Sequence, residues 1–146
     1  MDIIPDDHGN LRFLDIPDAF FQQLKSLPLA CDPAGSVSIE QRLYPSPILD
    51  PTSLDDMAAI EDWQHYVKPD LEQGNRDAIQ TVMDDLEMAQ STTDDEESNW
   101  YEFEVPAQHM QDWHHALNVA RLVMSGKYRL PLIEFPAKED EKLSLE

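Results

Sequence analysis

The stretch YEFEVPAQHMQDWHHALNVARLVM, residues 101–124, joins the clearest strand pattern in the sequence to the clearest helix pattern. Tyr101, Phe103 and Val105 alternate with two glutamates, which is typical of a strand that has one face in a core. Pro106 ends this strand and starts the helix. The apolar residues of the helix keep a spacing of three and four, which predicts a buried face formed by Met110, Trp113, Leu117, Ala120 and Met124. A strand followed by a long amphipathic helix indicates an α+β fold.

The N-terminal part of the chain adds short elements to this pattern. Apolar runs at residues 1–4 and 11–14 flank a turn sequence, so we expect an N-terminal β-hairpin. A short helix is expected from Pro17 to Leu27, because the following proline ends it. Residues 37–41 alternate in polarity and predict a brief strand.

Two further helices are expected in the middle of the chain. The first starts at Ser53 and runs to about Val67, with an apolar stripe of Met57, Ile60, Trp63 and Val67. Pro69 is expected to break this helix and to start a second one that reaches Met88 or Ala89. Residues 91–99 are expected to be a loop, and Gly126 is expected to cap the last helix.

The length of 146 residues suits one domain. We expect residues 1–135 to form a single globular domain and residues 136–146 to form a flexible charged tail. The expected fold class is mainly α with a small antiparallel β-sheet. This α+β fold has three longer helices, one short helix and the N-terminal hairpin.

The charge of the chain restricts its partners. Thirty acidic residues face ten lysines and arginines, which gives a net charge of −20. Nucleic-acid affinity depends on Lys and Arg, so direct binding of nucleic acid is not expected, and an anionic membrane is disfavoured for the same reason. Between Arg76 and Arg121 there is no Lys or Arg, which predicts one strongly negative side. The charge permits a protein partner with a basic surface; the alternative is that it only maintains solubility.

Cysteine usage and hydropathy indicate the compartment. Cys31 is the single cysteine, so no internal disulfide can form, which suits a reducing compartment. The N-terminus has no signal-peptide pattern, and no apolar run is long enough to span a bilayer. We therefore expect a cytoplasmic protein.

The residues most like a metal site are two copies of a carboxylate–imidazole pattern. Asp62 and His65 are three residues apart, as are Asp112 and His115. Carboxylate-bridged di-metal bundles use this spacing. However, the tryptophan inside each pattern lies on an apolar stripe, so neither the Asp nor the His points straight into the core. We expect no metal and no cofactor, and a di-metal helical enzyme built on these four residues remains the alternative.

Other catalytic signals are weak. The sequence has no nucleophile elbow and no phosphate-binding glycine loop. Asp32 beside Cys31 is expected to raise the pKa of the thiol. An arginine beside an apolar stripe of an acidic protein usually has a buried or half-buried partner, and this applies to Arg42 and Arg121. For Arg121 we favour an ion pair with an acid of the neighbouring helix, Glu61 or Asp62; the alternative is a polar groove, formed with Asn118, that binds a partner.

Two segments carry a family resemblance. The first is RLYP at residues 42–45, followed by an acidic amphipathic helix, and the second is WHHALNVARL at residues 113–122. Together they resemble a bacterial family of unknown function, whose members are short cytoplasmic helical proteins often encoded beside the Clp protease adaptor. The chain has Val119 where that family usually has Asp. The resemblance implies a mostly helical domain without known catalytic activity. An actinobacterial branch contains redox-responsive transcription regulators that use a cysteine pair, which a chain with Cys31 alone lacks.

Together these observations predict a non-enzymatic regulatory or adaptor protein that binds the basic surface of another protein. The candidates for a specific groove are Tyr44, Asn118 and Arg121. The candidates for the acidic face are Glu102 and Glu104. The alternatives are the di-metal enzyme and a DNA mimic that inhibits a basic protein. The oligomeric state stays open, with a homodimer as one option.

Overall fold

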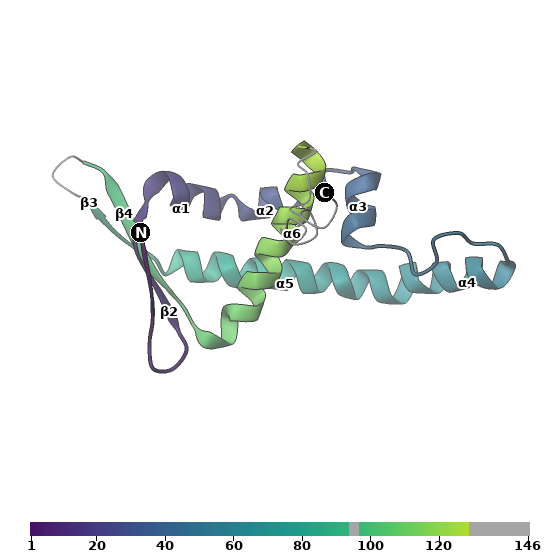
Figure 1. The fold of residues 1–146 in the computed structure, drawn as a ribbon, viewed down its shortest axis with the longest axis horizontal. Helices are drawn as coiled ribbons and strands as arrows, with labels where there is room; N and C mark the ends of the chain where they lie inside the picture. Colours follow the sequence, from purple (N-terminus) through teal and green to yellow (C-terminus); the bar gives the residue numbers. More distant parts are fainter. Residues whose placement is uncertain (94–96, 129–146) are drawn as a thin grey trace, which may run out of the picture.

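The computed structural model of the chain describes residues 1–93 and 97–128. The elements in chain order are β1 (Asp2–Pro5), β2 (Leu11–Pro17), α1 (Asp18–Lys25), α2 (Leu27–Ala30), α3 (Val37–Leu43), α4 (Leu54–Asp62), the π-turn η1 (Trp63–Val67), α5 (Lys68–Glu87), β3 (Gln90–Thr93), β4 (Asn99–Val105), the 3-10 turn η2 (Ala107–His109) and α6 (Met110–Tyr128) (Figure 1). The predicted α+β class, mainly helical with an antiparallel sheet and an N-terminal hairpin, is confirmed. Among the described residues, no helix has the length and hydropathy needed to cross a membrane. The expected tail, residues 136–146, lies outside the described residues.

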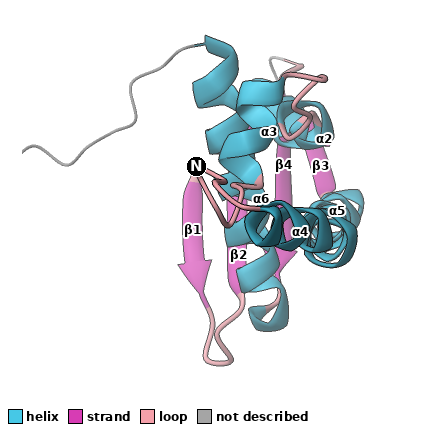
Figure 2. Cartoon of the chain, turned by 90° about the vertical axis from the view of Figure 1, so that its right-hand side faces the viewer, coloured by secondary structure: helices cyan, strands magenta, loops and turns pink. Residues whose placement is uncertain are grey.

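The sheet has four antiparallel strands in the order β1-β2-β4-β3. Figure 2 looks along α4 and α5 and shows the strands side by side in this order. β3 corrects the expected loop at residues 91–99, because the polar residues of β3 pair with β4 from Gln90 opposite Glu102 to Thr93 opposite Asn99. Their side chains are exposed, so the strand has no apolar alternation that the sequence could reveal.

A bulge keeps β2 in contact with the core over its whole length. The pairing of Phe13 with Phe103 is followed by the pairing of Ile16 with Tyr101, so β2 contains one extra residue at this point. Asp15 absorbs the extra residue with a φ of 54°, a left-handed conformation that Asp tolerates. Ile16 therefore returns to the core face, where it is fully buried.

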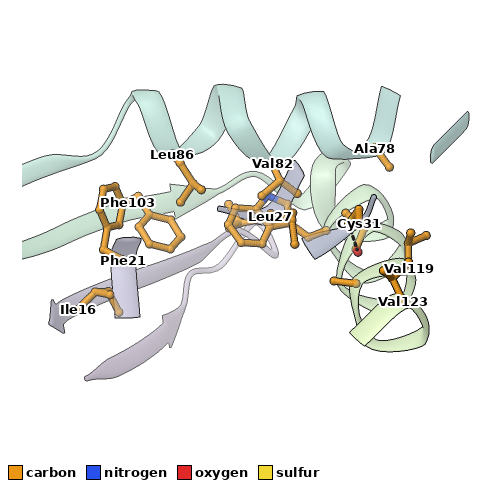
Figure 3. Packing of buried hydrophobic residues seen from close by; sticks show 14 of the residues in the cluster. Ile16, Phe21, Leu27, Cys31, Ala78, Val82, Leu86, Phe103, Val119 and Val123 are labelled. Atoms are coloured by element: carbon orange, nitrogen blue, oxygen red, sulfur yellow. Dashed lines mark hydrogen bonds between the residues drawn. The ribbon is translucent and has the colours of Figure 1, made fainter. Parts of the chain in front are cut away.

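Aromatic rings connect the sheet to the helices. Phe103 stacks on Phe13 at 4.8 Å and on Trp113 of α6 at 5.6 Å between ring centroids. Phe21 of α1 stacks on Tyr101 at 3.9 Å. The core continues along α5 through Ala78, Val82 and Leu86 and along α6 through Ala116, Val119 and Val123 (Figure 3). The predicted inward side of the 101–105 strand is confirmed, because Phe103 and Val105 are buried.

A long helical rod is the second main feature of the fold. α4, η1 and α5 follow one another without a gap, so the expected break at Lys68-Pro69 is wrong. Proline has no N–H to donate, and the π-turn before it accommodates this defect, with Lys68 N–H donating to the carbonyl of Trp63. We call residues 54–71 the helical arm. In α4 no residue is buried, and α4 lies at the end of the molecule opposite the sheet (Figure 1).

Residues 37–43 form α3, so the brief strand expected at 37–41 is wrong. The side chain of Ser36 caps this helix by accepting a hydrogen bond from Ile39 N–H at 3.4 Å. Ile39 is buried against α6, and Arg42 Nη1 donates to Ser125 Oγ of α6 at 3.3 Å. Arg42 therefore has the expected buried partner, Ser125.

Pro28 and Gly126 have different roles from those expected. Pro28 does not terminate a helix that reaches Leu27, because α1 ends at Lys25 and α2 starts at Leu27 with Pro28 in its first turn. Gly126 does not cap α6, which continues to Tyr128. Gly126 instead allows α3 to pack closely on α6, because a Cβ atom there would lie 2.6 Å from Ile39 Cγ1.

Candidate functional site

Tyr44, a predicted groove residue, is fixed between α3 and α5. It follows the last residue of α3, and its hydroxyl oxygen accepts a hydrogen bond from Asn75 Nδ2 at 2.8 Å. Lys68 Nζ lies 5.8 Å from the centroid of the Tyr44 ring. Burial raises the pKa of Tyr44, and the hydrogen bond from Asn75 only partly opposes this. The phenol is therefore a neutral, oriented group at neutral pH.

Asn75 extends this contact to α6. Its Oδ1 atom is hydrogen-bonded to His115 Nε2. The amide of Asn75 thus joins two residues that the sequence assigned to different candidate sites. Tyr44 was a candidate for the groove, and His115 was a candidate metal ligand. Asn75 itself was not predicted, because a single polar residue in an amphipathic helix gives no signal of its partners.

A pocket of about 480 Å³ opens beside Tyr44, between α2, α3 and α5. We call it the Tyr44 pocket. Its lining is Pro28, Cys31, Asp32, Pro33, Glu40, Tyr44, Glu72, Asn75, Arg76, Ile79, Gln80, Met83 and Val119. The lining contains three carboxylates and one guanidinium, and Ile79 and Met83 form an apolar part of the wall. The pocket can accommodate a cationic group with an aliphatic stem, such as a Lys or Arg side chain.

Cys31 is at the wall of this pocket but is not a nucleophile at neutral pH. Its side chain is buried, and Sγ donates to the carbonyl of Ala116 at 3.5 Å. Burial raises the pKa of the thiol to about 11. The predicted upward direction is confirmed, but its cause is burial rather than the neighbouring Asp32.

Glu102 and Glu104, the predicted acidic face, lie on the side of β4 that points away from Phe103 and Val105. Glu104 is opposite Arg12 of β2, and Glu102 is opposite Gln90 of β3. A shallow depression of about 480 Å³ runs over this part of the sheet. Its lining is Arg12, Leu14, Asp85, Met88, Gln90, Glu102, Phe103, Glu104 and Pro106.

The cation-free stretch between Arg76 and Arg121 folds onto itself. It forms most of α5, the strands β3 and β4, η2 and the first half of α6. β3 pairs with β4, and α5 packs against α6 and β4. The exposed carboxylates that the structure describes in this stretch are those of Asp77, Asp84, Glu87, Glu97 and Glu104. Residues 77–93 and 97–120 thus bring parts of adjacent elements together without Lys or Arg among them. Arg12 of β2 is opposite Glu104, and the cations of α5 and α6 lie in the remaining parts of these helices.

Asn118 and Arg121 lie together on the exposed side of α6. Arg121 donates to Asn118 Oδ1 from Nε at 3.2 Å and from Nη2 at 3.0 Å. The favoured ion pair of Arg121 with Glu61 or Asp62 is wrong, since those acids are in α4, within the helical arm. Asn118 also borders an open depression lined by Gly74, Met110, Gln111, Asp112, His114 and His115.

The four candidate metal ligands are not brought together. Asp112 Oδ2 accepts a hydrogen bond from Thr81 at 3.1 Å, and His115 is bound to Asn75. Asp62 and His65 are exposed on the arm, where the imidazole lies edge-on to Tyr66. Within residues 1–93 and 97–128, no group of three or more His, Cys, Asp or Glu is placed to hold a metal ion.

One buried polar cluster was missed by sequence reasoning. Asp85, which is 7% exposed, accepts a hydrogen bond from Trp113 Nε1 at 2.8 Å. His109 Nδ1 lies 2.9 Å from both carboxylate oxygens of Asp85. The cluster fixes the start of α6 on the end of α5, because a buried carboxylate is stable only with such partners. Asp85 lies among many other acids of the sequence, so its position gave no signal.

The model of the domain of unknown function DUF2017 matches residues 17–141. No curated protein and no solved structure matches the chain significantly.

Proposed function

The chain belongs to the DUF2017 family, a family of unknown function, and from its surfaces we propose that it is a non-enzymatic regulatory or adaptor protein. It acts by contact with a protein that has a basic surface. A bacterial, cytoplasmic setting belongs to this proposal and is supported by the family resemblance and by the single cysteine.

The observation that carries the proposal is the folding of the cation-free stretch into adjacent elements. Glu102 and Glu104 are at its centre, on the uncovered side of β4. Exposed charges within about 8 Å of one another reinforce each other at physiological salt, so clustered carboxylates attract a basic surface more strongly than dispersed ones. The Tyr44 pocket adds a shaped site for one cationic side chain, and Asn118 with Arg121 supplies polar contacts on α6.

Co-purification from native cells tests this function. The natural partner should be recovered at low salt and be lost as the salt concentration rises. The variant Glu102→Gln/Glu104→Gln should lower recovery about fivefold, which corresponds to losing roughly 1 kcal/mol of interaction. The matched control Asp7→Asn/Asp50→Asn removes the same charge from exposed positions outside the face and should change recovery less than about twofold. Recovery of no protein at low salt, or equal recovery with both variants, would contradict the proposal.

A further inference from the structure

The helical arm presents an apolar stripe that the rest of residues 1–93 and 97–128 covers only in part. The stripe consists of Met57, Ile60, Trp63, Val67 and Leu71, which follow one another at spacings of three and four. The exposed fractions are 57% for Met57, 42% for Val67 and 44% for Leu71, while Ile60 and Trp63 are partly buried. The sequence pattern predicted this stripe from Met57 to Val67, without Leu71, but not that it would lie outside the core.

An apolar stripe with this exposure is typical of a helix that packs against a helix of a binding partner. An amphipathic helix gains stability by packing its apolar stripe against another element, and most surface helices do so within their own domain. In α4 no residue is buried. Exposed apolar stripes of this kind mark sites where an amphipathic helix and its partner bury each other's apolar side chains.

The charge of the arm identifies the class of partner. The arm has five carboxylates: Asp55, Asp56, Glu61, Asp62 and Asp70. The arm has one lysine, Lys68, and this cation lies over the Tyr44 ring. A second copy of the chain would bring like charges together across the contact, which is unfavourable, whereas Lys and Arg beside an apolar face would pair with these acids.

We infer that the helical arm is the docking site for an amphipathic basic helix of another protein, with a leucine-rich face on the stripe and Lys or Arg residues beside the carboxylates. The inference rests on the proposed function, because it specifies the shape of the basic partner. It adds a second contact surface, separate from Glu102 and Glu104 on the sheet.

Two labelled helical peptides test the inference with the full-length chain. The first has leucines at helical spacing and lysines elsewhere; the second has the same lysines with alanines in place of the leucines. Fluorescence anisotropy should show at least about tenfold tighter binding of the leucine peptide, because only this peptide can bury the stripe. Equal affinity of the two peptides would overturn the inference but leave a purely electrostatic proposed function standing. Binding of neither peptide at low salt would overturn both.

Matched variants locate the contact. Val67→Ser/Leu71→Ser should reduce the affinity for the leucine peptide to that for the alanine peptide. The control Leu29→Ser/Val37→Ser removes two apolar side chains that are 70% and 67% exposed on α2 and α3, and should leave binding unchanged. Equal loss in both variants would overturn the inference. A concentration-dependent dimer that Val67→Ser/Leu71→Ser abolishes would also overturn it, because a second copy of the chain would then cover the stripe. Peptide binding only after removal of residues 129–146 would overturn it as well, because the chain's own C-terminal segment would then be the occupant.

Discussion

Replacing Gly126 with alanine tests how tightly α3 is packed on α6. In a helix interior this change alone favours folding by about 1 kcal/mol, because alanine loses less backbone entropy than glycine. At this position the new Cβ would lie 2.6 Å from Cγ1 and 3.3 Å from Cδ1 of Ile39. Ile39 is 4% exposed and cannot move freely, so overpacking should cost about 1 to 3 kcal/mol. We therefore expect Gly126→Ala to leave stability unchanged or to lower it by up to about 2 kcal/mol.

Gly74 provides the matched control, because it lies in α5 and nothing is within 4 Å of the position of its Cβ. Gly74→Ala should raise the free energy of unfolding by about 1 kcal/mol. Urea denaturation of both variants gives the cost of the contact as the difference between them, about 1 to 3 kcal/mol. Equal stabilisation by both substitutions would refute the close approach of α3 to α6 at this residue.

Three more predictions concern the core and the arm. Asp85→Ala should lower the free energy of unfolding by about 1 to 3 kcal/mol, because the Trp113 indole N–H loses its buried acceptor. Asp85→Asn keeps an acceptor and should lose less stability in the same urea titration. Equal losses of stability in the two variants would contradict the role of the hydrogen bond. The pKa of Cys31 rises from 9.0 to about 11 on burial, so the folded chain keeps a proton that the unfolded chain releases. Stability should therefore fall by about 2 kcal/mol more between pH 9 and 11 in the wild type than in Cys31→Ala, and parallel pH profiles would exclude this. Ser53→Ala removes the hydrogen bond that Ser53 Oγ accepts from Asp56 N–H at 3.1 Å. Amide exchange within residues 54–62 should rise about fivefold while global stability stays the same, and a loss of global stability would show that α4 is part of the core.

The sequence predicted the elements whose pattern comes from burial. Phe103, Val105 and Trp113 alternate or repeat with the period of their element because one side of it is in the core. Leu117 and Met124 were wrongly predicted for the buried face of the last helix, since they are 44% and 41% exposed. The hairpin was predictable because turn residues stand between two apolar runs. The acidic positions Glu102 and Glu104 followed directly, since residues between inward-facing strand positions face outward.

The features that the sequence did not predict depend on partners far away in the chain. β3 has no apolar residue, and it is a strand because β4 offers it a free edge. Gly126 resembles a helix cap until the distance to Ile39 is known. Asn75 and Asp85 are ordinary polar residues of α5, and their partners, His115 and Trp113, are 40 and 28 positions away. Among thirty acids, composition alone could not distinguish Asp85, whose carboxylate is buried against an indole.

The π-turn at residues 63–67 has a consequence for how this family can diverge. A π-turn corresponds to an α-helix with one residue inserted. Deleting a single residue here would restore regular geometry and rotate everything before it by roughly 100° about the helix axis. Met57 and its neighbours would then face another direction, although no exposed side chain had been replaced. The number of residues in this one turn therefore determines the direction in which the side chains of α4 point. A one-codon deletion here would change the side of the helix that α4 presents to a partner.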